Sequence, residues 1–159
     1  MPSGRRYPAA MSNRRSMLAM TGLHRALVRL TGGRLGWSIG AMRVIELETL
    51  GRRTGERRRA MLTVPVEEGD RLVVIASRGG DDCMPGWYLN LVDEPLVGVA
   101  EKGSAARPYR ARTADAAERA RLWPLAVRAY RGYAAYQRRT EREIPVVILE
   151  PESPAAADR

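Results

Sequence analysis

The sequence predicts an α+β fold in which about six antiparallel strands form a barrel or half-barrel, with helices packed outside it. The first observation is the order of the elements. Strand-like runs follow one another with turn residues between them, and they do not alternate regularly with helical patterns as in a parallel sheet. The second is the length, since 159 residues suit a single domain. The third is that the chain contains no internal repeat and no low-complexity region.

We expect one domain over residues 15–151, with loose tails at 1–14 and 152–159. The domain opens with a helical pattern at 16–31, which two glycines end. The apolar stripe of this helix consists of Met20, Leu23, Leu27 and Leu30.

Strand-like runs at 43–50, 59–66 and 71–77 follow, and glycine-containing turns separate them into an antiparallel meander. A loop at 78–86 and a short helical stretch that ends at Pro95 come next. A hairpin is expected from the strands at 96–101 and 107–113. A short helix at 133–141 and a last strand at 145–150 complete the domain.

A longer helix is predicted between this hairpin and the final short helix. Thr113 resembles its N-cap, and the helix should run to about Tyr130. Its expected apolar stripe consists of Ala116, Ala120, Trp123, Ala126 and Tyr130. Pro124 lies inside it and should kink or restart it.

The composition excludes several kinds of chemistry. The only cysteine, Cys83, cannot form an intrachain disulfide, and the only histidine, His24, supports neither a Ser-His-Asp triad nor a zinc site. No run approaches the ~20 apolar residues of a membrane span. No signal peptide is recognisable, so a reduced cytoplasmic setting is expected. If the chain is an enzyme, a bound cofactor should perform the chemistry, and no metal is expected.

The net charge of +9 predicts a surface that attracts anions. Candidate anions are nucleic acid, a phosphorylated cofactor and acidic lipid. Lys102 is the only lysine among 27 basic residues. The others are arginines, whose guanidinium groups bind phosphates and carboxylates through two parallel hydrogen bonds.

The most promising anion site is the turn from Gly51 to Gly55. Five arginines flank it: Arg52, Arg53, Arg57, Arg58 and Arg59. Backbone N–H groups and guanidinium groups can act together at such a turn. On a strand, Arg58 must face away from its two arginine neighbours, so one ligand cannot engage all of them. A solvated hairpin, a small-anion site and a nucleic-acid site all remain open from this run alone.

Three other groups of residues suit a ligand pocket. Ala76-Ser77-Arg78 precedes two glycines at a strand end, where a ligand can approach closely. A loop without a ligand site would show the same pattern. Asn90 is the ligand candidate in a helical turn whose apolar members suit the core. Three tyrosines share a helix face by their spacing and suit either a ring-shaped pocket or core packing: Tyr130, Tyr133 and Tyr136.

Together these pieces resemble the deazaflavin (F420)-dependent nitroreductase family, the split β-barrel flavin/deazaflavin oxidoreductases of actinobacteria. The resemblance runs from about Arg43 to Pro151. Its motifs are, in order, G-R-R-T-G, V-V-I-A-S-R-G-G, P-x-W-Y-L-N-L, E-R-A-R-L-W-P and Y-x-x-Y-x-x-Y-Q with T-x-R-x-I-P-V.

The resemblance implies an FMN-binding-like split barrel that passes a hydride from reduced F420 to a quinone-like, nitro or other electron-poor acceptor. Its cofactor residues would be Arg52, Arg53 and Arg58 at the acidic tail, with Ala76, Ser77, Arg78 and Asn90 along the groove. Its substrate wall would be Tyr130, Tyr133 and Tyr136. Tyr133, or else Ser77, would stabilise or protonate the developing anion.

The sequence departs from the family pattern on the substrate side. Ala60 and Met61 stand where the family often has a polar residue and a proline, and Thr63 stands where a tyrosine is common. The tail-binding arginines are intact. Nitroimidazole reduction therefore does not follow from the resemblance.

Three alternatives remain beside this interpretation. FMN could replace F420 on the same fold. A nucleic-acid protein would explain the charge, but no recognition motif is present, so no specific nucleic-acid partner is expected. A barrel without a cofactor could instead carry lipid. In that case the helix at 16–31 could lie with its arginines on the inner face of an anionic membrane. The alternative is that this helix packs on the barrel. The oligomeric state stays open.

Overall fold

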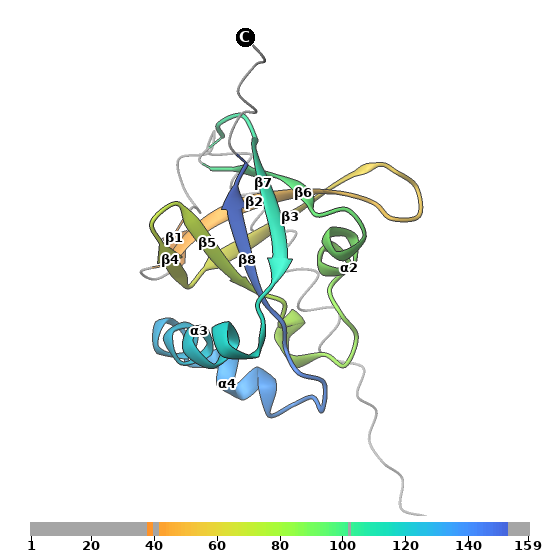
Figure 1. Cartoon of the computed structure of the whole chain (residues 1–159). Coiled ribbons are helices and arrows are strands. Elements are labelled where there is room, and N and C mark those ends of the chain that lie inside the picture. Colours follow the sequence, from red (N-terminus) through yellow and green to blue (C-terminus); the bar gives the residue numbers. More distant parts are fainter. Residues whose placement is uncertain (1–37, 40–41, 102, 153–159) are drawn as a thin grey trace, which may run out of the picture.

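Within the residues that the structure describes, eight strands form one antiparallel sheet that curls into a half-barrel (Figure 1). This computed structural model describes residues 38–39, 42–101 and 103–152. The strands are β1 (Ser38–Ile39), β2 (Met42–Leu50), β3 (Arg57–Val64), β4 (Val66–Glu68), β5 (Arg71–Ile75), β6 (Leu96–Ala100), β7 (Arg107–Thr113) and β8 (Val146–Pro151). Apart from β1 and β4, these strands are the six that the sequence predicts, so the fold class is confirmed.

The strands are hydrogen-bonded in the order β1-β2-β6-β7-β8-β5-β4, and β3 pairs with β2. The β2–β3 ladder runs from Arg43 opposite Val64 to Leu50 opposite Arg57. The hairpin that it forms extends well beyond the rest of the sheet and passes close to α2 (Gly86–Asp93) (Figure 1). This projection places the arginine turn away from the barrel core.

The remaining helices lie outside the sheet and are η1 (Arg78–Gly80), α3 (Ala116–Ala129) and α4 (Gly132–Gln137). They explain why β5 and β8 are apolar at successive positions, because both faces of these strands are covered. One face points into the half-barrel and carries Leu72, Val74, Val147 and Leu149. The other face packs against α3 and α4 and carries Val73, Ile75, Val146 and Ile148.

Helix α3 begins later than the sequence predicts. Asp115, not Thr113, is its N-cap: the Asp115 Oδ1 accepts from the backbone N–H of Glu118 at 2.8 Å, and the Glu118 carboxylate accepts from the backbone N–H of Asp115 at 3.0 Å. Thr113 is the last residue of β7, paired with Val147. Pro124 lies within the helix without ending it.

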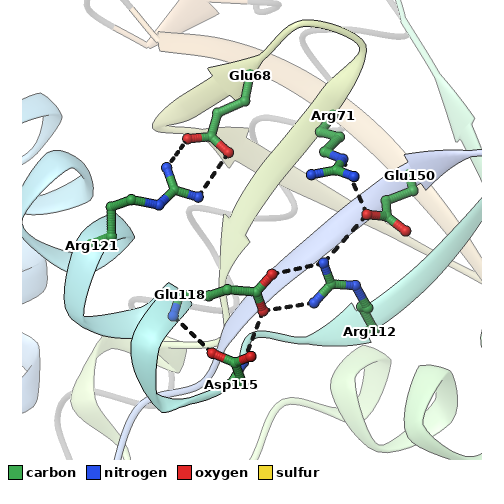
Figure 2. A network of polar contacts seen from close by, with 7 residues as sticks. All are labelled: Glu68, Arg71, Arg112, Asp115, Glu118, Arg121 and Glu150. Atoms are coloured by element: carbon green, nitrogen blue, oxygen red, sulfur yellow. Dashed lines mark hydrogen bonds and ion pairs between the residues drawn. The ribbon is translucent and has the colours of Figure 1, made fainter.

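Ion pairs join α3 to the sheet (Figure 2). Arg112 on β7 pairs with Glu118 at 2.7 Å and with Glu150 on β8 at 3.3 Å. Arg121 on α3 binds the carboxylate of Glu68 on β4 through two hydrogen bonds. The hydrogen bonds from Arg112 and from the Asp115 backbone lower the pKa of Glu118 to about 2. The helix is therefore fixed to the sheet at two points along its length.

Several boundaries differ from the predicted ones. Pro65 divides the run predicted as one strand at 59–66 into β3 and β4, because proline cannot donate to a ladder. Ala116 and Ala120 are exposed on α3, and Leu122 occupies the buried stripe with Ala126. The predicted helix at 16–31, His24 and residues 1–14 lie outside the described residues. Among the helices of the described ranges, none is long and apolar enough to cross a bilayer.

Candidate active site

Two adjoining hollows form one groove along β3. The first, of about 420 Å³, lies against the arginine turn and the start of α2. The second, of about 550 Å³, lies between β3, η1 and the tyrosines. The residues that line both hollows are Arg59, Ala60, Gly86 and Trp87. A ligand with a charged end and a ring-shaped end would therefore find a continuous path past Trp87.

The arginine turn is held by its own backbone. The Gly51 carbonyl accepts from the N–H groups of Thr54 at 3.1 Å and Gly55 at 2.7 Å, and the Gly51 N–H donates to the Glu56 carbonyl at 2.8 Å. Gly55 adopts a φ of +67°, a conformation that favours glycine. The N–H groups of Gly51, Thr54 and Gly55 are therefore used within the turn, and, contrary to the prediction, they do not join the guanidinium groups in binding an anion.

The arginines of this hairpin divide between its two faces, as the strand geometry predicts. Arg57 and Arg59 both pair with Glu48, whose side chain is buried on the face turned away from the first hollow. The other three line the first hollow: Arg52, Arg53 and Arg58. Arg59 lines it as well. The pairs of Arg57 and Arg59 with Glu48 therefore stabilise the hairpin, and the arginines not bound to Glu48 are available at the groove.

The charges of the groove arginines are only partly compensated. Arg58 pairs with Glu56 at 2.6 Å. The guanidinium of Arg52 touches no carboxylate, and that of Arg53 has no polar partner, among the residues that the structure describes. Guanidinium groups without a carboxylate attract phosphate and carboxylate ligands. This end of the groove is thus suited to an anion.

Asn90 lies beneath this turn rather than in the middle of the groove. It is 6% exposed and lines the first hollow. Its Oδ1 accepts from the backbone N–H of Arg52 at 3.3 Å, and its Nδ2 donates to Thr49 Oγ1 at 3.1 Å. The residue predicted to contact the cofactor therefore also fixes the position of an arginine that would bind its tail.

The three tyrosines meet at the other end of the groove. Ring centroids are 5.2 Å apart for Tyr130 and Tyr133, and 6.3 Å apart for Tyr133 and Tyr136. The Tyr130 and Tyr136 hydroxyls are 3.2 Å apart and share a hydrogen bond. All three line the second hollow. Only Tyr133 and Tyr136 lie on one helix, α4, whereas Tyr130 is the extended residue that follows α3, so the helix face predicted for all three is wrong.

Two of these phenols hold their protons firmly. Burial raises the pKa of Tyr133, and a hydrogen bond from Thr63 acts against it. The hydrogen bond with Tyr130, together with burial, raises the pKa of Tyr136 to about 12. At neutral pH both groups are therefore protonated and able to donate a hydrogen bond to a ligand oxygen.

The segment predicted around Ser77 is only partly at the groove. Ser77 and Arg78 line the second hollow. Ala76 lines neither hollow, because it is fully buried and its N–H donates to the Pro145 carbonyl at 3.0 Å. Arg78 has a φ of +47°, which is unusual for a residue with a side chain. Its Nη1 donates to the Met84 carbonyl at 3.0 Å and so holds this backbone conformation.

Arg142, for which the sequence predicts no role, organises the same segment. Its guanidinium donates to the backbone carbonyls of Ser77 and Asp81, both at 2.9 Å, and of Ala76 at 3.3 Å. Burial lowers the pKa of Arg142. Arg142 belongs to the T-x-R motif. Its partners are backbone carbonyls, which every residue type has, so the sequence contains no pattern that identifies them.

The groove therefore combines an arginine-lined end with a phenol-lined pocket. A family model described as F420H(2)-dependent quinone reductase matches residues 20–151. The chain belongs to this family. It is thus an oxidoreductase of the split-barrel, deazaflavin-dependent kind that the motifs resemble, with reduced F420 as its hydride donor.

Individual relatives support the assignment. The F420H(2)-dependent quinone reductase Rv1261c of Mycobacterium tuberculosis is 40% identical over 133 residues, which are 80% of this chain and 87% of that protein. A solved F420-H2 dependent reductase (FDR-A) is 39% identical, with a TM-score of 0.60 over 67% of this chain and 93% of its own. Another solved relative, described as a domain-swapped dimer, is 32% identical, with a TM-score of 0.63 over 86% of this chain and 99% of its own.

The described residues fit the cofactor that the family names. F420 carries an acidic tail and a flat deazaflavin ring, as the resemblance implies. The charges of Arg52 and Arg53 meet no carboxylate at one end of the groove, and an aromatic wall stands at the other. The match to this family favours F420 over FMN.

Proposed function

We propose that this chain reduces a quinone with a hydride from reduced F420, binding the acidic tail at Arg52, Arg53 and Arg58. The ring would lie beside Ser77 and Arg78, and the quinone would lie against the tyrosines. The observation that carries the proposal is the continuity of the groove. Trp87 belongs to both hollows, so the anion site and the phenol wall can serve one bound pair of molecules.

The cofactor supplies the hydride from carbon C5 of its reduced ring. The protein residues supply placement, a partly dry pocket and a proton. Reduction of a quinone to a hydroquinone takes up two electrons and two protons. The hydride carries both electrons and one of the protons, so the second proton must come from another group.

Tyr133 is the residue that we propose to donate this proton. Its hydroxyl lies at the second hollow, is protonated at neutral pH and is 5% exposed as a residue. A general acid in such a position stabilises the oxyanion as it develops. Water then restores the proton. Ser77 lines the same hollow and is the second candidate, but the buried Tyr133 has the more fixed hydroxyl.

A titration of tryptophan fluorescence tests the cofactor assignment, because Trp87 lines the groove. Saturable quenching by F420, with FMN much weaker, is the expected result. Arg53→Gln should weaken F420 binding. Equal quenching by both cofactors, or none by F420, would contradict the proposal. Trp123 lies on α3 and lines neither hollow, so its fluorescence should change less than that of Trp87.

A membrane-surface contact is a second proposal, and it rests on where the charge lies. Residues 1–37 contain seven of the 27 basic residues and none of the 18 acidic ones. The rest of the chain, with 20 basic and 18 acidic residues, is nearly neutral. A basic segment with apolar residues favours an anionic lipid surface, where quinones dissolve. The same distribution weakens the case for nucleic acid, because many arginines of the described residues are paired with carboxylates.

Vesicle co-sedimentation of the full chain tests the lipid contact. Anionic vesicles should retain the protein, and neutral vesicles should not. The double variant Arg25→Gln/Arg29→Gln should bind anionic vesicles less while its quinone reductase activity with a water-soluble quinone stays unchanged. Equal binding to both kinds of vesicle would contradict a charge-driven contact.

A further inference from the structure

We propose that Thr63 is a positioning residue that orients the Tyr133 hydroxyl toward the bound acceptor and supports its oxygen after the proton has left. The inference rests on the proposed function, because it assigns a partner to the proton donor named there. Thr63 is the seventh residue of β3, and Tyr133 is the second of α4. The two residues are 70 positions apart and meet only in the folded chain.

The contact between the two hydroxyls is short and specific. Thr63 Oγ1 and Tyr133 Oη are 2.9 Å apart, and either atom can be the donor. Within the described part of the chain, the Tyr133 hydroxyl has no other hydrogen-bond partner. The neighbouring phenols of Tyr130 and Tyr136 bond to each other. Thr63 is thus the group that decides where the Tyr133 proton points.

The direction of this hydrogen bond has a chemical consequence. A hydroxyl carries one hydrogen and two acceptor lone pairs. When Thr63 donates to Tyr133, the phenol hydrogen is free to point into the second hollow, which both residues line. When Tyr133 donates to Thr63, that hydrogen is no longer available to a ligand. An acceptor oxygen placed next to the Tyr133 hydroxyl selects the first arrangement, because only then does the phenol hydrogen point to it.

The same bond matters after proton transfer. The Tyr133 oxygen then carries a negative charge in a nearly closed position, and a buried charge without a hydrogen-bond donor is strongly disfavoured. The Thr63 hydroxyl supplies that donor. Hydrogen bonds to charged groups contribute about 1.5–3 kcal/mol, which corresponds to roughly 10- to 100-fold in rate. Loss of the Thr63 hydroxyl should therefore slow turnover by about this factor.

The test compares Thr63→Val, which keeps the shape of the side chain and removes its hydroxyl, with Thr63→Ser, which keeps the hydroxyl. Valine suits a strand, so the fold should be retained. Thr63→Val should lower kcat roughly 10- to 100-fold while the Kd for F420 and the KM for a water-soluble quinone change less than about threefold. Thr63→Ser should restore most of kcat. A kcat for Thr63→Val equal to that of the wild type would overturn the inference.

A double-mutant cycle separates this inference from the proposed function. In a Tyr133→Phe background, Thr63→Val should have no further effect on kcat, because the hydroxyl that it positions is gone. An undiminished effect of Thr63→Val in that background would show a general packing role and overturn the inference. A Tyr133→Phe variant with wild-type kcat would instead overturn the assignment of Tyr133 as proton donor. Should Thr63→Val not fold, a loss of kcat in Thr63→Ser as large as that in Thr63→Ala would equally overturn the role of the hydroxyl.

Discussion

Asn90 on α2 fixes Arg52 at the tip of the β2–β3 hairpin. Its Oδ1 accepts hydrogen bonds from the backbone N–H of Arg52 at 3.3 Å and from the Arg52 Nη1 at 3.4 Å. The arginine turn is therefore attached to α2 before any ligand binds. Preorganisation of this kind lowers the entropy lost when a long, charged ligand is bound.

Replacement of Asn90 should separate stability from binding. Asn90→Ala leaves Thr49 and the Arg52 N–H without partners and should reduce the free energy of unfolding by about 1–3 kcal/mol. Asn90→Asp keeps an acceptor for Arg52, and the Thr49 hydroxyl can rotate to donate to it. Its added charge should nevertheless weaken F420 binding roughly tenfold. Urea unfolding and fluorescence titration measure the two effects, and wild-type affinity in Asn90→Asp would contradict this account.

The two faces of the hairpin provide a matched pair of arginine variants. Arg53→Gln removes a charge that has no carboxylate partner in the described residues and should weaken F420 binding roughly tenfold. Its dependence of binding on salt concentration should also become less steep. Arg57→Gln is the control, because Arg57 pairs with Glu48 on the opposite face. Equal losses in both variants would show that only the total charge matters.

The pairing of Glu118 predicts a loss of stability in acid. Its pKa is about 2 in the folded protein, below its ordinary value of 4.5. A lowered carboxylate pKa stabilises the folded state above pH 4.5, and this contribution is lost as the pH falls from about 4.5 to about 2. Since the pair is partly exposed to solvent, the contribution should be about 1 kcal/mol or less. Urea unfolding at several pH values should show a weaker acid dependence in Glu118→Gln, and an unchanged slope would remove this ion pair from the explanation.

Two glycines with positive φ form another matched pair. At Gly80 the φ is +81°, and an added Cβ would lie 2.6 Å from the Tyr136 carbonyl oxygen. At Gly69 the φ is +60° and the space is open. Gly80→Ala should cost about 2 kcal/mol or more and displace the tyrosines, with a loss of quinone turnover. Gly69→Ala should cost about 1 kcal/mol and leave turnover unchanged. Similar activities in the two variants would contradict the close packing of η1 against α4.

Local features of the chain were the ones that the sequence could predict. The arginine turn depends on residues within ten positions of one another, and Tyr133 and Tyr136 share α4 through a helical spacing of three. Tyr130 joins them from the extended residue after α3, which the spacing does not predict. The start of α3 was misplaced because Thr113 and Asp115 are both good N-cap residues. Only the β7–β8 pairing, which includes Thr113, decides between them.

Contacts between distant segments could not be predicted. Thr63 and Tyr133 come from a strand and a helix that no local pattern relates, and the Arg142 guanidinium binds backbone carbonyls of any residue type. The family motif predicts Ala76 at the groove. Its burial follows from the packing of β5 against β8, which a single sequence does not reveal.

The most direct test of the central claim is anaerobic mixing of the protein with reduced F420 and a water-soluble benzoquinone, followed by the absorbance of oxidised F420. The account predicts catalytic oxidation by the wild type and a large loss of F420 affinity in Arg52→Ala/Arg53→Ala, while Arg57→Gln behaves as the wild type. Oxidation no faster than in the absence of protein would contradict it.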